Sequence, residues 1–170
     1  MYNDVFTKGF QILDGSVYTN QFDVTSVNWA YEGGTNNDYH PTNDVEFITV
    51  ALKTLHAQIE TDFVTPYFPN YEVERTRIWE GVNKDVQEWH DHYYTHPNFF
   101  FLLYWSDIQK DGEGSVWFTN LSHDVEYEVK PTPGTLIAVN NNGNFLHRVD
   151  PSSHVRVLAE FYFDINYDND

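Results

Sequence analysis

The chain has 170 residues, of which 41% are hydrophobic and 18% aromatic, enough for one folded domain with a real core. Its 26 acidic and 9 basic residues give a formal net charge of -17. Such an acidic protein repels phosphate backbones and anionic lipid surfaces, so no nucleic-acid or membrane partner is expected. The absence of cysteine excludes disulfides, thiolate metal ligands and cysteine nucleophiles.

The sequence lacks any run of about 18 apolar residues, the minimum for a membrane-spanning helix. Its first residues also lack the basic and apolar regions of a signal peptide. We therefore expect a cytoplasmic protein. A single domain is expected over residues 1–170, with a helical and loop-containing N-terminal segment (1–68) and a β-rich core (69–165).

The N-terminal segment contains one clear helical pattern. Up to about residue 40 the chain is polar and aromatic, and residues 33–38 have the composition of a loop. Apolar residues then recur at three- and four-residue spacing, at Val45, Ile48, Leu52, Leu55 and Ile59. This spacing predicts an amphipathic helix over about residues 44–62, with Asn43 as N-cap and Pro66 beyond its end. His56 is predicted to be a solvated residue on this helix, away from the apolar stripe.

The remainder of the chain predicts strands. Short runs of β-branched and aromatic residues alternate with turn residues, and the run 99–105 is so apolar that it predicts a strand buried on both faces. Seven further strands are predicted at 71–79, around His90, at 115–119, 125–129 and 135–139, around His147, and at 155–163. Eight strands complete a two-sheet jelly roll. The predicted fold class is therefore mainly β, a double-stranded β-helix (jelly roll) with the N-terminal segment packed on it.

Three of the eight histidines indicate a metal site. His90 and His92 are one residue apart on an extended segment, so their rings project to the same side of a strand. His147 returns from far along the chain and could complete one face of a coordination sphere. Imidazole suits Fe, Zn, Cu and Ni, so ligand softness alone does not choose the metal. The other histidines, which include His96 and His123, stand beside turn residues or on the helix and are not assigned to the site.

Several motifs follow one another in a recognisable order. Trp89-His90 precedes the strand and turn of residues 101–114, and the turn Pro133-Gly134 precedes His147. Arg156 then stands on the last predicted strand. In this order and spacing, residues 70–163 resemble the small jelly-roll oxygenases that use Fe(II) and 2-oxoglutarate, a superfamily that includes the prolyl hydroxylases.

The resemblance implies an oxidoreductase in which Fe(II) is bound by His90 and His147. It also implies that Arg156 anchors the far carboxylate of 2-oxoglutarate. A guanidinium suits this task because it is permanently charged and binds a carboxylate through two parallel hydrogen bonds. Tyr104 is expected to donate a second hydrogen bond to the same carboxylate. The expected reaction is the hydroxylation of a C–H bond in a peptide or a small molecule.

One position departs from the family pattern. The family's third ligand is an acid two residues after the first histidine, where this chain has His92. Three interpretations remain open. His90, His92 and His147 form a three-histidine site, as in some cupin dioxygenases; a local kink lets Asp91 bind in place of His92; or the site has lost its metal and the fold serves binding or structure. Neighbouring strand residues point to opposite faces, so Asp91 would need a bulge or a loop.

Two alternatives belong to other functional classes. A cupin-like metal-binding dioxygenase or isomerase would use the same histidines without 2-oxoglutarate, and Arg156 facing away from the metal would favour it. A non-catalytic jelly-roll module would use aromatic strand faces for binding, and a filled pocket without metal would favour it. An exposed aromatic strand edge would also allow a homodimer.

Overall fold

The computed structural model describes residues 2–22, 29–31, 39–41, 45–81, 86–94, 96–107, 112–153 and 156–166. Within these ranges the helices are α1 (Asn3–Thr7), α2 (Ser16–Gln21) and α3 (Val45–Ile59). Helix α3 continues into one π-helical turn, Glu60–Val64. None of the helices in the described part of the chain combines the length and apolar character needed to cross a bilayer.

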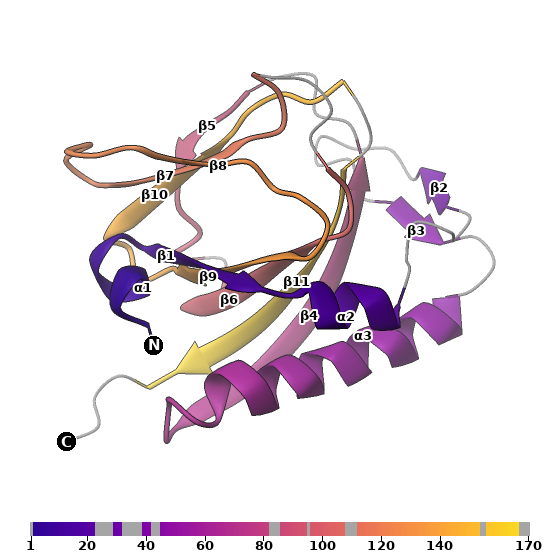
Figure 1. The fold of residues 1–170 in the computed structure, drawn as a ribbon. Coiled ribbons are helices and arrows are strands. Elements are labelled where there is room, and N and C mark those ends of the chain that lie inside the picture. Colours follow the sequence, from indigo (N-terminus) through magenta and orange to yellow (C-terminus); the bar gives the residue numbers. More distant parts are fainter. Residues whose placement is uncertain are drawn as a thin grey trace.

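Two antiparallel sheets lie opposite each other (Figure 1). The five-stranded sheet has the order β1 (Phe10–Asp14), β9 (Thr135–Asn140), β6 (Phe99–Tyr104), β11 (Arg156–Ile165) and β4 (Tyr71–Gly81). The four-stranded sheet has the order β5 (Gln87–His90), β10 (Phe145–Val149), β7 (Val116–Asn120) and β8 (Tyr127–Val129). A separate hairpin joins β2 (Trp29–Tyr31) to β3 (Tyr39–Pro41).

The mainly β class is confirmed, and each of the eight predicted strands corresponds to a strand of the two sheets. The N-terminal segment was predicted only to pack on the core, but its strand β1 also belongs to the five-stranded sheet, where it pairs with β9 at the edge. This strand was not predicted. It is only five residues long, and its inner and outer residues do not separate cleanly into apolar and polar types.

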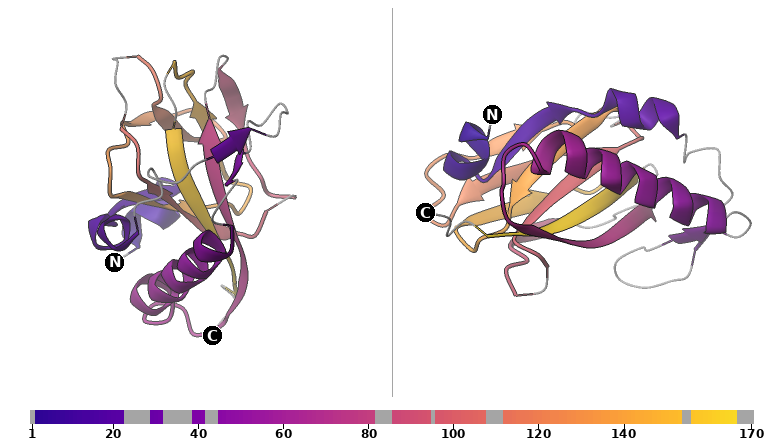
Figure 2. Two further views of the ribbon diagram at one scale, coloured as in Figure 1. Left: turned by 90° about the vertical axis from the view of Figure 1, so that its right-hand side faces the viewer. Right: turned by 90° about the horizontal axis from the view of Figure 1, so that it is seen from below.

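The long helix α3 lies against the outer face of the five-stranded sheet, as the view from below shows (Figure 2). Leu52, Leu55 and Ile59 of the predicted stripe are buried. The helix therefore forms where the apolar spacing predicts it, and it ends before Pro66. The predicted N-cap, Asn43, lies outside the described residues.

The prediction that His56 is solvated was wrong. Its side chain is only 6% exposed, and its ring centroid lies 4.7 Å from that of Phe163 and 5.6 Å from that of Phe161. Position 56 is one turn beyond Leu52, so it belongs to the same face of the helix. The apolar stripe of a core-facing helix is wide enough to include this position. Burial lowers the pKa of the His56 imidazole.

The buried His56 should make the protein less stable as the pH falls. Because the folded-state pKa lies below the unfolded one, the unfolded chain binds more protons, and the free energy of unfolding falls once the pH drops below about 6.5. Urea unfolding at pH 7.5 and pH 5.5 measures this loss. The variant His56→Phe keeps a ring but cannot titrate, so its stability should fall less over that interval. An equal loss of unfolding free energy in the wild type and in His56→Phe would show that His56 does not cause the pH dependence.

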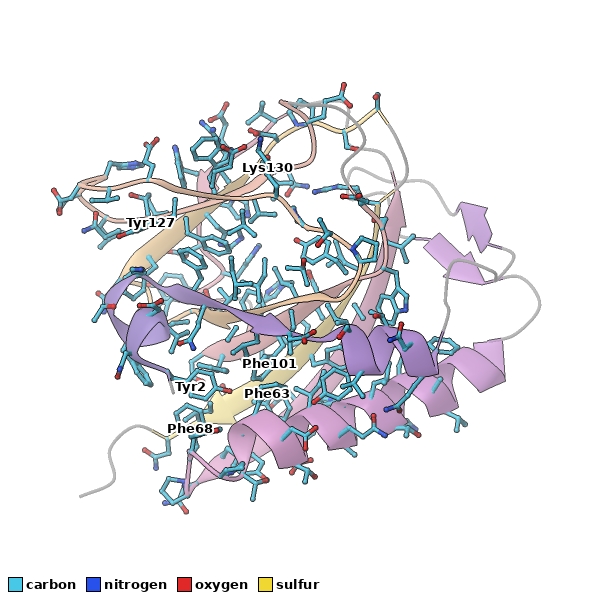
Figure 3. All side chains as sticks on the ribbon, viewed as in Figure 1. Tyr2, Phe63, Phe68, Phe101, Tyr127 and Lys130 are labelled. Atoms are coloured by element: carbon cyan, nitrogen blue, oxygen red, sulfur yellow. The ribbon has the colours of Figure 1, made fainter. Side chains whose placement is uncertain are left out.

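Strands β6 and β11 of the five-stranded sheet are buried on both faces. One face packs under the helices, where Tyr2, Phe63, Phe68 and Phe101 gather (Figure 3). The opposite face, with Phe100, Tyr104, Leu158 and Tyr162, is turned toward the four-stranded sheet. The strand predicted at 99–105 is thus buried on both sides, as its composition required. The space between the two sheets is where the site lies.

Candidate metal centre

A cavity of about 380 Å³ opens between the inner faces of the two sheets. Apolar side chains such as Phe100, Leu102 and Val116 form much of its wall. The polar part of the wall contains His90, His92, His96, His147, Arg156 and Glu160. The volume lies within the range of about 300–1,000 Å³ typical of small-molecule sites.

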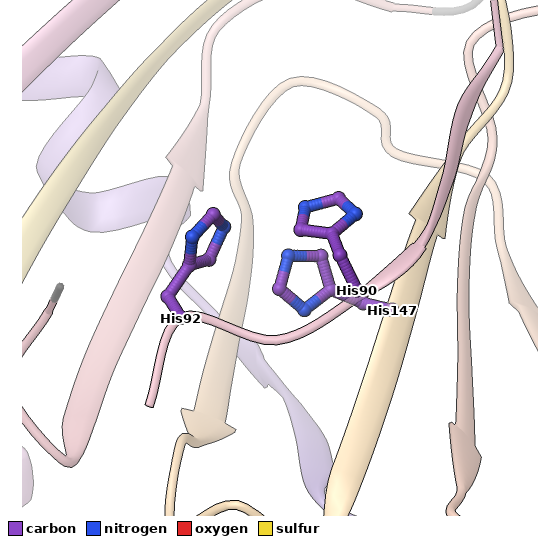
Figure 4. Close-up of side chains that lie close together, drawn as sticks. All are labelled: His90, His92 and His147. Carbon is purple, nitrogen blue, oxygen red and sulfur yellow. The ribbon is translucent and has the colours of Figure 1, made fainter. Parts of the chain in front are cut away.

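His90, His92 and His147 converge on one point of this cavity (Figure 4). The pairing of β5 with β10 puts His90 opposite His147, and residues directly opposite in antiparallel strands share a face. His92 follows just beyond the end of β5. One nitrogen of each ring lies within 4.8 Å of the others. The ring centroids are 4.3 Å apart for His90 and His147, 4.8 Å for His90 and His92, and 4.9 Å for His92 and His147.

A hydrogen bond of His90 and the pKa of His147 both suit metal binding. Nδ1 of His90 lies 2.5 Å from the carbonyl oxygen of Glu88. A carbonyl only accepts, so Nδ1 carries the proton and Nε2 has the free lone pair. Burial, and then the neighbouring His90, His92 and His96, hold the pKa of His147 well below its usual value. His147 is therefore neutral at physiological pH, which is the form that binds a metal.

Asp91 has a different set of contacts. Its Oδ1 accepts a hydrogen bond from the backbone N–H of Tyr93 at 3.2 Å, and this bond forms part of the turn that follows β5. The group of close ligand atoms found among the described residues contains His92 and lacks Asp91. The geometry therefore favours His92 as the third side chain.

His96 is a fourth ring in the cavity that the sequence analysis did not assign to the site. It stacks on His92, with centroids 4.3 Å apart and planes 23° apart, and lies 5.2 Å from the ring of Tyr162. The hydroxyl of Tyr162 in turn donates a hydrogen bond to Glu160. The four-residue spacing from His92 to His96, followed by Pro97, was the only sequence signal for this position.

Arg156 and Tyr104 both line the cavity. Tyr104 is opposite Leu158 in the pairing of β6 with β11, so Arg156, two residues before Leu158, lies on the same face of the sheet. Arg156 is 5% exposed and Tyr104 is 3% exposed. Burial raises the pKa of Tyr104 to about 12 against the opposing effect of Arg156, so its phenol stays protonated and can donate. Burial lowers the pKa of Arg156, whose guanidinium nevertheless keeps its charge.

No protein-family model matches this chain, and no curated protein matches it either. Comparison of folds is informative, however. The chain shares its fold with several solved structures, at sequence identities between 12% and 14% for the three proteins described next.

The first of these proteins is HygX from Streptomyces hygroscopicus, solved with iron bound, with 14% identity, a TM-score of 0.66 and coverage of 96% of this chain and 84% of HygX. HygX has also been solved with nickel, 2-oxoglutarate and hygromycin B bound. The second is an oxidoreductase of the 2-oxoglutarate–Fe(II) oxygenase family from Burkholderia pseudomallei (12% identity, TM-score 0.65, coverage 95% and 87%). The third is a prolyl hydroxylase from Trichoplax adhaerens in complex with a hypoxia inducible factor peptide (13% identity, TM-score 0.56, coverage 95% and 86%).

Proposed function

We propose that this protein is an Fe(II)- and 2-oxoglutarate-dependent oxygenase in which His90, His92 and His147 bind the metal. One observation carries the proposal: three imidazoles with ligand atoms within 4.8 Å of one another line the same cavity as a buried arginine. In this proposal the two facing sheets are the halves of a jelly roll, and residues 1–170 form a single domain.

The donor set fits a catalytic metal of this class. Three neutral imidazoles from two neighbouring segments hold an ion from one side and leave the rest of its coordination sphere to a co-substrate. The hydrogen bond from His90 to the Glu88 carbonyl fixes the orientation of one ring, as outer partners of metal-binding histidines commonly do. Together with 2-oxoglutarate, the bound iron would supply the oxidation of a C–H bond by O₂.

The part of the cavity wall that contains Arg156 and Tyr104 fits a carboxylate of 2-oxoglutarate. Arg156 offers a planar pair of N–H donors for a carboxylate, and the protonated Tyr104 beside it offers a further donor. Leu102 and Leu158 lie beside these polar groups on the inner face of the five-stranded sheet. Their side chains limit the access of water to the carboxylate, and this strengthens its interaction with the arginine.

Replacing the family's acidic ligand with a histidine has an electrostatic consequence. Three neutral ligands leave the full double charge of the ion uncompensated, whereas a carboxylate would remove one unit. One carboxylate of 2-oxoglutarate would then supply a negative charge to the ion, while Arg156 compensates the other carboxylate. We therefore propose that metal and 2-oxoglutarate bind to this site with mutual reinforcement.

A second candidate function is that of a metal-dependent dioxygenase or isomerase that works without 2-oxoglutarate. The three-histidine set itself favours it, since such sites occur in cupins. The position of Arg156 on the cavity wall favours the 2-oxoglutarate-dependent reaction instead. A non-catalytic module is disfavoured because the cavity between the sheets is open rather than filled by side chains.

The substrate is proposed to be a peptide or a small molecule. Structural neighbours of this fold were solved with ligands of both kinds, a hypoxia inducible factor peptide in one case and hygromycin B in another. The homodimer and the cytoplasmic location remain predictions from the sequence.

Turnover of the co-substrate tests the proposed function without knowledge of the substrate. Protein reconstituted with Fe(II) under reducing conditions is incubated with 2-oxoglutarate and O₂, and succinate is measured. We expect slow succinate formation that requires both the protein and the iron. If the protein binds iron but neither binds 2-oxoglutarate nor forms succinate, the oxygenase proposal is wrong and the cupin-like function is favoured.

A further inference from the structure

A buried amide side chain, that of Asn141, lies behind the histidine cluster. It directly follows β9 and is 4% exposed. Its backbone N–H donates to the carbonyl of Asn98 at 2.9 Å, which joins the end of β9 to the segment that leads into β6. Asn141 is distant in sequence from the metal-facing segment, yet it lies in contact with it.

The Asn141 side chain forms hydrogen bonds with both ends of the loop from His92 to Pro97. Its Oδ1 accepts a hydrogen bond from the backbone N–H of His92 at 3.1 Å. Its Nδ2 donates to the carbonyl of His96 at 3.3 Å and to that of Pro97 at 3.0 Å. One amide thus satisfies one backbone donor and contacts two backbone acceptors of a single short loop.

The loop itself closes on the same two residues. The backbone N–H of His96 donates to the carbonyl of His92 at 2.9 Å, and the two rings stack 4.3 Å apart. The tie to Asn141 therefore fixes His92 and His96 together. His92 needs such a support because it lies beyond the end of β5, where no strand pairing sets its position, unlike His90 and His147.

We propose that Asn141 is a positioning residue of the metal site, which holds the ring of His92 at the point where His90 and His147 meet. This inference rests on the proposed three-histidine metal site. Asn141, at the end of β9, would not bind the metal itself. Its hydrogen bond would keep His92, a loop residue, in the position that a metal ligand needs.

The chemistry of the amide is specific to this task. Leucine has a similar volume but would leave the His92 N–H without its acceptor and two partly buried carbonyls without their donor. Aspartate would keep the acceptor but would face the carbonyls of His96 and Pro97 with a second acceptor. Only a side chain that accepts on one atom and donates on another can serve both ends of the loop.

The neighbouring Asn140 offers a matched control. It is also a buried asparagine, 3% exposed, and its Nδ2 donates to the carbonyl of Val5 in helix α1 at 3.3 Å. Its amide therefore supports the N-terminal helix and not the histidine loop. Asn140→Ala should cost stability as Asn141→Ala does, but without an effect on the metal.

A double-mutant cycle tests the proposal, with Ni²⁺ as the probe and affinity measured by calorimetric titration of metal-free protein. Asn141→Ala should weaken Ni²⁺ binding by roughly 10- to 100-fold, the range for loss of an outer partner of a metal ligand. Asn140→Ala should change it by less than about 3-fold. In a His92→Ala background, Asn141→Ala should cause almost no further loss, because its effect acts through His92. Circular dichroism at the titration temperature shows that each variant is folded.

Each contrary result has a distinct meaning. Unchanged Ni²⁺ affinity in folded Asn141→Ala overturns the positioning role, and so does an equally large further loss in the His92→Ala background. Failure of the wild-type protein to bind Ni²⁺ overturns the metal site and the positioning role together. Failure of succinate formation in a protein that binds metal normally overturns only the oxygenase function and leaves the role of Asn141 intact.

Discussion

His147→Ala should lose the metal and, with it, all formation of succinate. His147 contributes one of three imidazoles that meet within 4.8 Å, and no other side chain of strand β10 belongs to that group of ligand atoms. The loss in metal affinity should exceed the roughly 10- to 100-fold that follows loss of an outer partner, because a direct ligand is removed. Equilibrium dialysis against Fe(II) or Ni²⁺, followed by metal analysis, measures it.

His123→Asn is the matched control for this variant. His123 lies outside the cavity, where it pairs with Glu126 at 3.6 Å, and its backbone φ is 54°. Asparagine tolerates this left-handed conformation better than alanine does. This variant should bind metal as the wild type does. Full metal content in His147→Ala would show that the metal binds elsewhere.

The variant Arg156→Ala should still bind the metal, but it should bind 2-oxoglutarate much more weakly than the wild type does. The carboxylate of the co-substrate would then be buried beside Tyr104 without its cation. Removing one partner of a buried ion pair costs about 3–5 kcal/mol. This corresponds to a loss of roughly 100- to several-thousand-fold in affinity. Arg156→Lys should fall in between, because lysine keeps the charge but not the planar pair of donors. Calorimetric titration of 2-oxoglutarate into Ni²⁺-loaded protein measures the difference.

Arg148→Gln serves as the control for charge alone. Arg148 lies on the other face of β10, between the rings of Trp89 and Trp117, with its guanidinium carbon 5.2 Å and 5.0 Å from their centroids. Loss of this charge should leave 2-oxoglutarate binding unchanged. If Arg156→Ala also bound 2-oxoglutarate normally, Arg156 would not be the residue that binds the far carboxylate. This result would favour the cupin-like function.

Much of the fold follows from local patterns in the sequence. Most of the eight strands after Pro69 were predictable because they are compact runs of β-branched and aromatic residues between turns. The partners of these strands were not predictable from the runs themselves. The edge strand β1 shows why: its residues acquire their inner and outer faces only through pairing with β9, more than 120 positions away. His56 is a different case, because its four-residue spacing from Leu52 already puts it on the helix face that packs against the sheet.

The candidate site shows the same limit as strand β1. The sequence paired His90 with His92 as residues of one extended strand, but β5 ends at His90, and the backbone of His92 is instead held by Asn141. The resemblance to the oxygenase family added His147 and Arg156 to the prediction. The place of His96 depends on a turn that is signalled only by its spacing from His92 and by Pro97. The role of Asn141 depends on a contact across 49 positions, which no local pattern encodes. The structure favours the open interpretation with His92 over that with Asp91, because the Asp91 carboxylate instead binds the backbone of its own turn.

Sequential titration of metal-free protein is the most direct test of the central claim. Ni²⁺ is added first and 2-oxoglutarate second, and the heat of each step is recorded. The account predicts one metal ion per chain, one 2-oxoglutarate per metal-loaded chain, and far weaker binding of 2-oxoglutarate without metal. Absence of stoichiometric metal binding, or metal binding that persists when His90, His92 and His147 are all replaced by alanine, would contradict it.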